Sequence, residues 1–239
     1  MFDRIRKAFS SDAKEPVEAA ASTSDPVHGP VSEWAATQGF GFSVDRTGHG
    51  VSLEGKVSGK PWRLQLGSPS RQYIRGDEVR ARAELGIDED VAIVVMSRPL
   101  KEALEKQAYQ IYTDNLQTSI DSNLPEEMRW LAMYEEVGWE SLPAEFWERY
   151  AVMSDQRESA LAWVDPALAR LMLDWPEPAP SAEVPFVMLL LRGKAYLRME
   201  YSPADLATLR HAALIFTSAC ESALGSLAGP IAPDLSLPA

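Results

Sequence analysis

Basic side chains are concentrated in one short stretch of the sequence. Residues 60–83 carry six basic side chains against two acidic ones. The basic residues are Lys60, Arg63, Arg71, Arg75, Arg80 and Arg82. Because guanidinium groups bind carboxylates and phosphates through paired hydrogen bonds, this stretch could receive an anionic ligand or an acidic partner segment. The candidate binding residues are Arg71, Arg75, Arg80 and Arg82. The alternative is that these side chains only solvate the outer face of a sheet.

A second candidate contact lies at the N-terminus. Phe2, Ile5 and Phe9 are spaced i, i+3 and i+7, which places them on one face of a short amphipathic segment over residues 1–9. Such a face is suited to a membrane surface or a partner protein. The alternative is a frayed or docked end, since nine residues are too few for a stable helix in water. Residues 10–30 are rich in Ala, Ser, Pro and charge, and predict a flexible tether.

Side chains for catalysis are sparse. His211 and Cys220 are nine residues apart on one predicted helix, which puts them on opposite sides and roughly 13–14 Å apart along its axis, too far for a catalytic dyad. Cys220 lies on the apolar stripe of that helix and is expected to be a small core residue. The sequence carries no common phosphate-binding, zinc-protease or serine-hydrolase motif. We therefore assign no catalytic residue and no cofactor.

Acidic residues suggest a metal site only weakly. Asp45 followed by Glu54 and Lys56 resembles the acidic pair plus lysine with which some restriction-type nucleases hold a divalent metal. Such triplets are abundant, and Lys56 adjoins a tight turn, so no metal ligand is assigned.

Two further acidic pairs lie in one predicted helix that begins at Pro125 and ends before Gly138. Glu126 and Glu127 fall in its first turn and Glu135 and Glu136 in its last, where we expect ordinary solvated faces.

The overall charge narrows the class of partner. The chain of 239 residues carries 23 basic and 35 acidic side chains, for a net charge of −12. Residues 101–239 hold 10 of the basic and 21 of the acidic ones, so the surplus belongs to the second half. Because non-specific nucleic-acid binding depends on Lys and Arg, nucleic acid is not expected as a partner. The single cysteine excludes an intrachain disulfide.

Hydropathy sets the expected location. Composition is that of a globular chain, with 46% hydrophobic and 24% charged residues. No apolar run reaches the roughly 18–20 residues that span a bilayer, and the basic N-terminus is not followed by the apolar region of a signal peptide. We expect a cytoplasmic protein, with peripheral contact at the inner membrane surface as a further possibility.

Periodicity predicts an α+β fold of antiparallel strands and hairpins covered by helices, with a long C-terminal helix. A meander of antiparallel strands is the simplest arrangement for the first half. The predicted strands are 51–57, 61–66, 78–85, 91–96, 150–153, 184–191 and 195–201. The predicted helices are 31–38, 100–120, 125–138, 155–164, 165–175 and 203–227, with Ser202 as the cap of the last one.

The expected organisation is a single α+β domain over residues 31–227, with residues 228–239 as a tail. Two packed halves, about 31–122 and 123–227, are the alternative. The last helix carries an apolar stripe that suits either the covering of the sheet or a partner helix. The stripe is Leu206, Leu209, Ala213, Phe216, Cys220, Ala223 and Leu227.

Two parts of the chain resemble uncharacterised bacterial sequences. The pattern from Phe146 and Tyr150 through Ser154, with Asp165-Pro166 and a later hairpin, resembles a segment of an uncharacterised bacterial domain family. The stretches 71–85 and 125–130 look like hypothetical proteins of proteobacterial type. The resemblance implies no activity, cofactor or catalytic residue.

These observations favour a non-enzymatic module that binds a protein partner or a membrane surface. The contact faces would be the N-terminal apolar face and the strand face from Arg71 to Arg82. The competing hypothesis is an enzyme or small-ligand-binding protein in which Arg75, Arg80 and Arg82 hold an anionic substrate. A third is an assembly role for the C-terminal helix.

Overall fold

Alternating apolar residues build one antiparallel sheet. The computed structural model describes residues 28–46, 48–115 and 126–227, and within them nine strands pair in the order β1-β2-β3-β4-β9-β8-β5-β7-β6. The strands are β1 (Gly41–Val44), β2 (Val51–Val57), β3 (Lys60–Gly67), β4 (Glu78–Glu84), β5 (Ala92–Ser97), β6 (Glu135–Val137), β7 (Tyr150–Ser154), β8 (Phe186–Leu191) and β9 (Lys194–Glu200). All neighbouring strands are antiparallel, which confirms the predicted α+β class.

The first four strands form the predicted meander, but β5 does not continue it. The β8–β9 hairpin lies between β4 and β5, with β9 paired to β4 and β8 paired to β5. The physical reason is that β5 is buried on both faces, whereas β4 exposes a charged face. A strand that is apolar on both faces is stable only where both faces of the sheet are covered.

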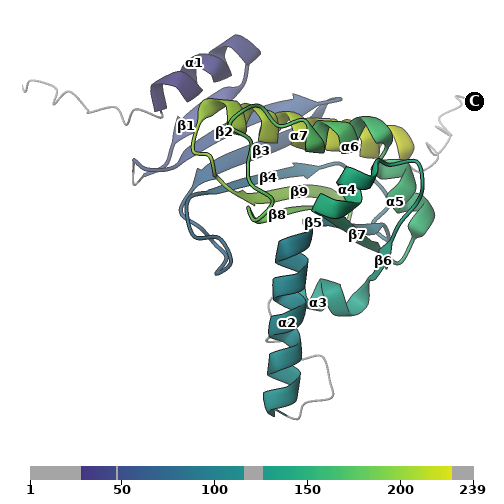
Figure 1. The fold of residues 1–239 in the computed structure, drawn as a ribbon. Coiled ribbons are helices and arrows are strands. Elements are labelled where there is room, and N and C mark those ends of the chain that lie inside the picture. The colour runs from purple at the N-terminus through teal and green to yellow at the C-terminus, as the bar shows by residue number, and fades with distance from the viewer. Residues whose placement is uncertain (1–27, 47, 116–125, 228–239) are drawn as a thin grey trace, which may run out of the picture.

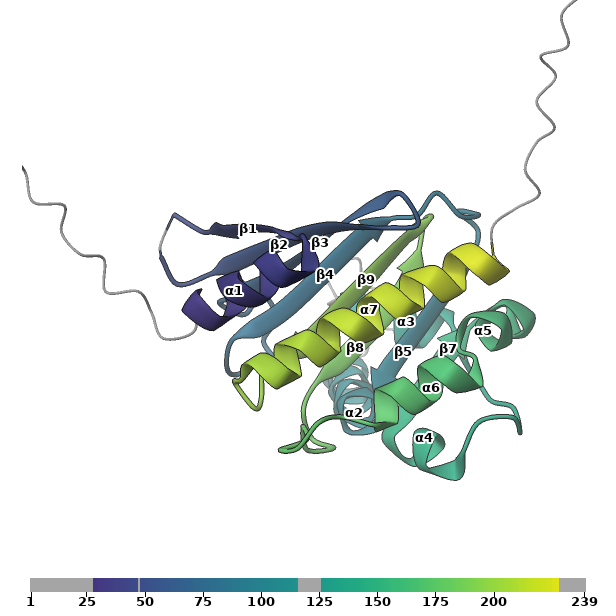
Figure 2. The ribbon, with the colours of Figure 1, turned by 90° about the horizontal axis from the view of Figure 1, so that it is seen from above.

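Helices cover one face of the sheet along its whole width (Figures 1 and 2). They are α1 (His28–Gln38), α4 (Ala144–Arg149), α5 (Arg157–Trp163), α6 (Pro166–Leu173) and α7 (Leu206–Ser226). Helix α7 runs across β2, β4 and β9 and also packs on α5 and α6. Its stripe is buried, with Phe216 and Cys220 at 0% exposure. The stripe therefore serves the core, as the first of its two interpretations predicted.

The opposite face is covered over only part of its width. Helices α2 (Arg98–Asn115) and α3 (Glu126–Met133) pack there on β5, β7 and β8. Leu100, Leu104 and Trp130 meet Val94 and Leu189 in a second, smaller apolar cluster. Helix α2 projects away from the sheet on this side (Figure 1). Among the described residues, no helix covers the same face of β2, β3 and β4 (Figure 1).

Three predicted helix boundaries are wrong by three residues or more. The first helix begins at His28 rather than at residue 31, within the range predicted as a tether. The helix expected to end before Gly138 ends at Met133, and Glu135 and Glu136 lie instead in β6, which pairs with β7. The last helix begins at Leu206 rather than at residue 203. Its cap is Asp205, whose carboxylate accepts a hydrogen bond from the Thr208 amide at 2.7 Å, so Ser202 is not the cap.

Candidate functional site

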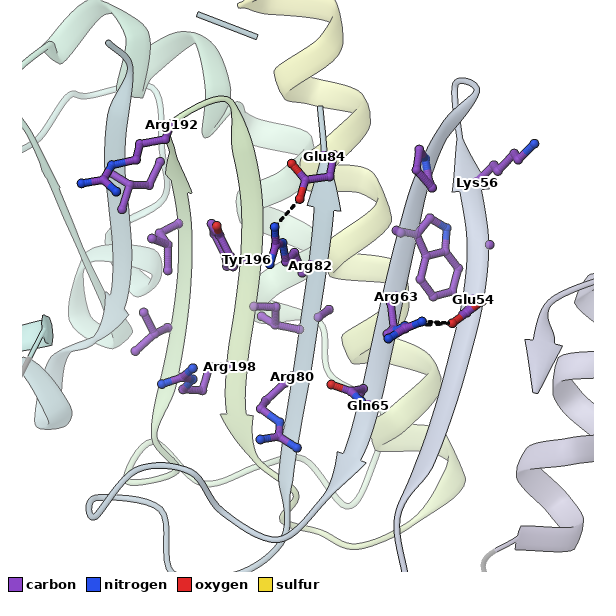
Figure 3. Close-up of a pocket in the computed structure, with 18 of the residues that line it drawn as sticks. Glu54, Lys56, Arg63, Gln65, Arg80, Arg82, Glu84, Arg192, Tyr196 and Arg198 are labelled. Carbon is purple, nitrogen blue, oxygen red and sulfur yellow. Dashed lines mark hydrogen bonds and ion pairs between the residues drawn. The ribbon is translucent and has the colours of Figure 1, made fainter. Parts of the chain in front are cut away.

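A groove lies on the uncovered part of the sheet. It has a volume of about 1220 Å³ and is floored by β2, β3, β4, β9 and β8, with α3 at one side. Figure 3 shows the floor from the solvent side, with side chains of four strands pointing toward the viewer. The groove is lined by seven basic residues and four acidic ones, although the chain as a whole is acidic. The basic residues are Lys56, Arg63, Arg71, Arg80, Arg82, Arg192 and Arg198.

Strand register explains why these side chains share one face. Arg80 stands opposite Gln65 on β3 and Arg198 on β9, and Arg198 stands opposite Val187 on β8. In the next row of the same face, Arg82 lies between Arg63 and Tyr196. Because successive side chains of a strand alternate between faces, the alternation of β4 places both arginines on the groove side and its valine and alanines in the core.

Like charges therefore face each other across neighbouring strands, which destabilises a sheet unless carboxylates neutralise them. Arg63 is paired with Glu54 of β2. Arg82 is paired with Glu84 of its own strand, and Glu84 also lies 3.2 Å from the Lys194 ammonium. Partial burial favours the neutral form of the Glu84 carboxyl. Its bonds with Arg82 and Lys194 outweigh this effect and lower its pKa. These pairs are exposed and contribute little to stability.

Arg198 is held by two carboxylates that are almost completely buried. Its Nε lies 2.9 Å from Glu78 Oε1, and its Nη1 donates to Glu127 Oε1 at 3.3 Å. Glu78 and Glu127 are 0% and 1% exposed. Glu78 Oε2 accepts from the Ser70 amide at 2.6 Å. Arg198 is thus fixed in place by the structure around it.

Glu127 also joins α3 to the segment before β4. Its Oε1 accepts from Arg71 Nε at 2.6 Å and from the Tyr73 hydroxyl at 3.0 Å. Partial burial disfavours the charged form of Arg71, but the hydrogen bond and the charge of Glu127 outweigh this effect and raise the pKa of Arg71. Burial and the neighbouring Glu127 raise the pKa of Tyr73. The expectation that Glu127 lies on a solvated face is wrong, because this carboxylate is buried and forms ion pairs with Arg71 and Arg198.

Arg80 differs from its neighbours on the floor. Of the four arginines that the strands place there, it is the one that forms no ion pair with a carboxylate of residues 28–46, 48–115 or 126–227. Its Nε is buried and has no hydrogen-bond partner in that part of the chain. The partly buried side chain lies at the centre of the floor, and in Figure 3 no dashed line reaches it. A buried donor without a partner is costly, which marks Arg80 as the position at which an anion would be stabilised.

Three of the four predicted binding arginines line the groove. They are Arg71, Arg80 and Arg82. Arg75 does not line it: its side chain is exposed in the segment before β4, and its backbone amide donates to Glu200 Oε2 at 2.8 Å. Arg75 lies outside the alternation of β4, so no register directs it to the floor. The predicted contact residues Phe2, Ile5 and Phe9 lie outside the described residues, so membrane contact stays a prediction.

Sequence reasoning missed several lining residues. Arg198 and Tyr196 come from a strand more than a hundred residues later in the chain, and Trp130 and Glu127 come from α3. The signal that could have found Arg198 is the alternation of β9, which matches that of β4. Nothing in the sequence shows that these two strands are neighbours.

The other chemical candidates do not form sites in the described part of the chain. Glu54, considered with Asp45 as a metal ligand, is paired with Arg63. No group of three or more His, Cys, Asp or Glu side chains there is placed to hold a metal ion. Cys220 is buried, and burial raises its pKa to about 12. His211 Nε2 lies 2.8 Å from the Leu171 carbonyl oxygen and donates a hydrogen bond to it, because a carbonyl can only accept.

Comparison with known proteins gives a weak likeness in fold. No family model matches the chain, and no curated protein matches it. The crystal structure of the mycobacterial trehalose monomycolate transport factor A, TtfA, is similar over 84% of this chain and 95% of that chain, with 11% identity and a TM-score of 0.43. At this level the likeness assigns no activity or ligand. The resemblance to uncharacterised bacterial sequences stays a prediction.

Within the described ranges, no helix combines the length and the apolar composition that a membrane span requires.

Proposed function

We propose that this protein is a non-enzymatic binding module whose groove receives a carboxylate or phosphate group of its partner at Arg80. The observation that carries the proposal is the guanidinium of Arg80, which has no carboxylate partner among the described residues and is surrounded by arginines that have one. A ligand anion supplies the missing partner.

The neighbours of Arg80 support binding at this position. Arg198 is held in place by two buried glutamates, and Arg82 is paired with Glu84 at the exposed surface. An anion between them would gain charge-assisted hydrogen bonds, each contributing about 1.5–3 kcal/mol. Little side-chain entropy of Arg198 would be lost on binding, since buried carboxylates already hold it.

The lining favours binding over catalysis. The described residues that line the groove include arginines, glutamates and Tyr196, but neither His211 nor Cys220. A nucleophile with an adjacent base is the usual basis of acyl or phosphoryl transfer, and the arginines of this groove are too basic to serve as the base. The arrangement is suited to holding an anion.

Titration with simple anions tests the proposal. The ¹⁵N-labelled full chain is titrated at constant ionic strength with inorganic phosphate and with triglutamate, and backbone amide shifts are followed by NMR. We expect shifts centred on β3, β4 and β9, and at least tenfold weaker binding for Arg80→Met. The matched control is Arg75→Met, which removes an arginine outside the groove and should leave the affinity unchanged. Equal affinity of the Arg80→Met protein and the unsubstituted protein would refute the proposal.

A further inference from the structure

We infer that the anion received at Arg80 is a carboxylate, and that phosphate esters are disfavoured there. This inference rests on the proposed function, because it names the ligand chemistry of the same site. Two features of the structure lead to it. One is the balance of charges around Arg80, and the other is the wall that closes one side of the site.

Two buried carboxylates lie close to the position of the ligand. Glu78 precedes Arg80 by two residues on β4, so both side chains lie on the same face of the strand, about 6.7 Å apart along it. Arg198 stands opposite Arg80 on β9, and its guanidinium lies 2.9 Å from Glu78 and 3.3 Å from Glu127. Because both carboxylates are almost completely buried, solvent screens their charges little.

The charges of this inner group leave room for one negative charge. The group has three cations and two buried carboxylates, an excess of one positive charge. Its members are Arg71, Arg80, Arg198, Glu78 and Glu127. Glu126, which is 44% exposed and lies 3.4 Å from Arg71, reduces that excess further. The second negative charge of a phosphate monoester would therefore face Glu78 and Glu127 without a counter-charge, which is costly at a partly buried site.

Charges farther along the floor do not change this balance. Arg82 and Glu84 form a pair whose side chains are 54% and 49% exposed, and Glu84 also contacts Lys194. Arg63 and Glu54 form another exposed pair. The remaining basic residues of the lining, which are exposed near the hairpin turns, are Lys56 and Arg192. Water and salt screen such exposed charges, so those of the inner group dominate at Arg80.

The side of Arg80 that faces β9 is closed. Arg198 lies there with Glu127 of α3 against it, and the Arg198 side chain is only 23% exposed. On the other side Arg80 stands opposite Gln65 of β3, which is exposed. Figure 3 shows Arg80 between Arg198 and Gln65. A ligand therefore reaches Arg80 from the β3 side of the floor.

An approach from one side suits an anion with a single substituent. The two oxygens of a carboxylate lie in one plane with its substituent, which matches the planar guanidinium group. A phosphodiester has two substituents that leave the phosphorus atom in different directions, so one of them would meet the wall formed by Arg198 and α3. A phosphate monoester has one substituent but carries about 1.5–2 negative charges at pH 7. Of the anions that the proposed function allows, only the carboxylate has both one charge and one substituent.

The experiment compares three small anions on the ¹⁵N-labelled full chain at constant ionic strength. They are acetate, methyl phosphate and dimethyl phosphate, and dissociation constants are taken from the amide shifts of β3, β4 and β9. At pH 8 we expect acetate to bind at least fivefold more tightly than either phosphate ester. The second pKa of a phosphate monoester is about 6, so lowering the pH to 5.5 removes most of the second charge of methyl phosphate. Its affinity should rise at least threefold, while that of dimethyl phosphate, whose charge is constant, should stay the same.

Substitutions that remove one negative charge test the charge balance. Glu127→Gln keeps an oxygen that can accept from Arg71 and Tyr73, and at pH 8 it should raise the affinity for methyl phosphate relative to acetate at least threefold. Glu126→Gln changes a half-exposed side chain of the same helix, so it leaves the core intact and should shift the ratio in the same direction. The matched control is Glu54→Gln, which removes a lining carboxylate from an exposed pair on β2 and should leave the ratio unchanged.

Two tripeptides identify the source of the carboxylate. One is acetylated and ends in a free carboxylate, and the other is capped at both ends and carries one central glutamate. Tighter binding of the first than of acetate supports a C-terminal carboxylate, and tighter binding of the second supports a side-chain carboxylate. Equal binding of acetate and both tripeptides supports a small carboxylic acid.

The possible results separate this inference from the proposed function. If methyl phosphate at pH 8 or dimethyl phosphate binds as tightly as acetate, and Arg80→Met weakens that binding, the anion site is confirmed and the carboxylate inference is wrong. A ratio that neither Glu127→Gln nor Glu126→Gln changes would also overturn the inference. If none of the three anions binds at Arg80, and triglutamate does not bind there either, both proposals are wrong.

Discussion

Replacement of Arg80 should leave the free protein as stable as before or make it more stable, whereas replacement of its neighbour Arg198 should destabilise it strongly. The comparison is informative because the two arginines face each other on β4 and β9, on the same face of the sheet. Methionine is the substitution of choice, since it keeps an unbranched apolar stem and removes the charge.

The structure sets the size of both effects. The buried Nε of Arg80 has no partner in the part of the chain that the structure describes, and an unsatisfied buried donor costs about 1–3 kcal/mol. Its removal recovers part of that cost and relieves the like charge of Arg198, so we expect a change in unfolding free energy between about 0 and +2 kcal/mol. Arg198→Met removes the partner of two buried glutamates, Glu78 and Glu127. Breaking such a buried ion pair costs about 3–5 kcal/mol.

Urea unfolding at pH 7, followed by far-ultraviolet circular dichroism, measures both changes. The expected result is a midpoint for Arg80→Met equal to or above that of the unsubstituted protein, and a much lower midpoint for Arg198→Met with a similar m-value. A loss of more than about 1.5 kcal/mol on Arg80→Met would show that Arg80 has a structural role, and would refute the reasoning that it is reserved for a ligand.

Three further predictions test the fold. Gly55→Ala should cost about 1–3 kcal/mol in thermal or urea unfolding, because the new Cβ would lie 2.6 Å from Cζ2 of the buried Trp62; Gly138→Ala, where nothing lies within 4 Å, is the control, and equal losses would contradict the packing described. Burial lowers the pKa of His211, so the native state resists a proton that the unfolded state takes up near pH 6.5. Protonation of His211 in the unfolded state therefore lowers the free energy of unfolding as the pH falls below 6.5, and has no effect well above that pH. His211→Gln should flatten a stability profile measured from pH 8 to 5, and an unchanged profile would count against this. Burial raises the pKa of Cys220 to about 12, so alkylation of the native protein by iodoacetamide at pH 8 should be at least a hundredfold slower than in urea, and comparable rates would contradict the buried placement.

Local patterns were sufficient to predict the elements that form the floor of the groove. The strand predicted over residues 78–85 forms as β4, and Arg80 and Arg82 lie on its outer face. The strand predicted over residues 91–96 forms as β5, and its apolar run is buried on both faces. These features depend on residues within one turn or one strand, which is the range over which the sequence is informative.

The neighbours of Arg80 could not be predicted, since they depend on pairings between distant segments. Insertion of the β8–β9 hairpin beside β4 brings Arg198 next to Arg80. Glu127, taken for a solvated helix residue, is buried because α3 packs against the same face. These long-range contacts decide which arginine is paired with a carboxylate of the described residues, so the sequence indicated a basic strand face without distinguishing Arg80 within it.

The side-chain ¹⁵N spectrum of the arginines tests the central claim most directly. Substitution by methionine assigns the Nε–Hε resonance of Arg80, and triglutamate is then added at constant ionic strength. The account predicts that the Arg80 resonance shifts downfield in a saturable manner, as expected when an N–H gains a carboxylate acceptor. Arg198, which already has carboxylate partners, should shift much less. An Arg80 resonance that stays unchanged, or that moves no more than that of the distant Arg75, would contradict the claim that Arg80 is the anion-binding residue.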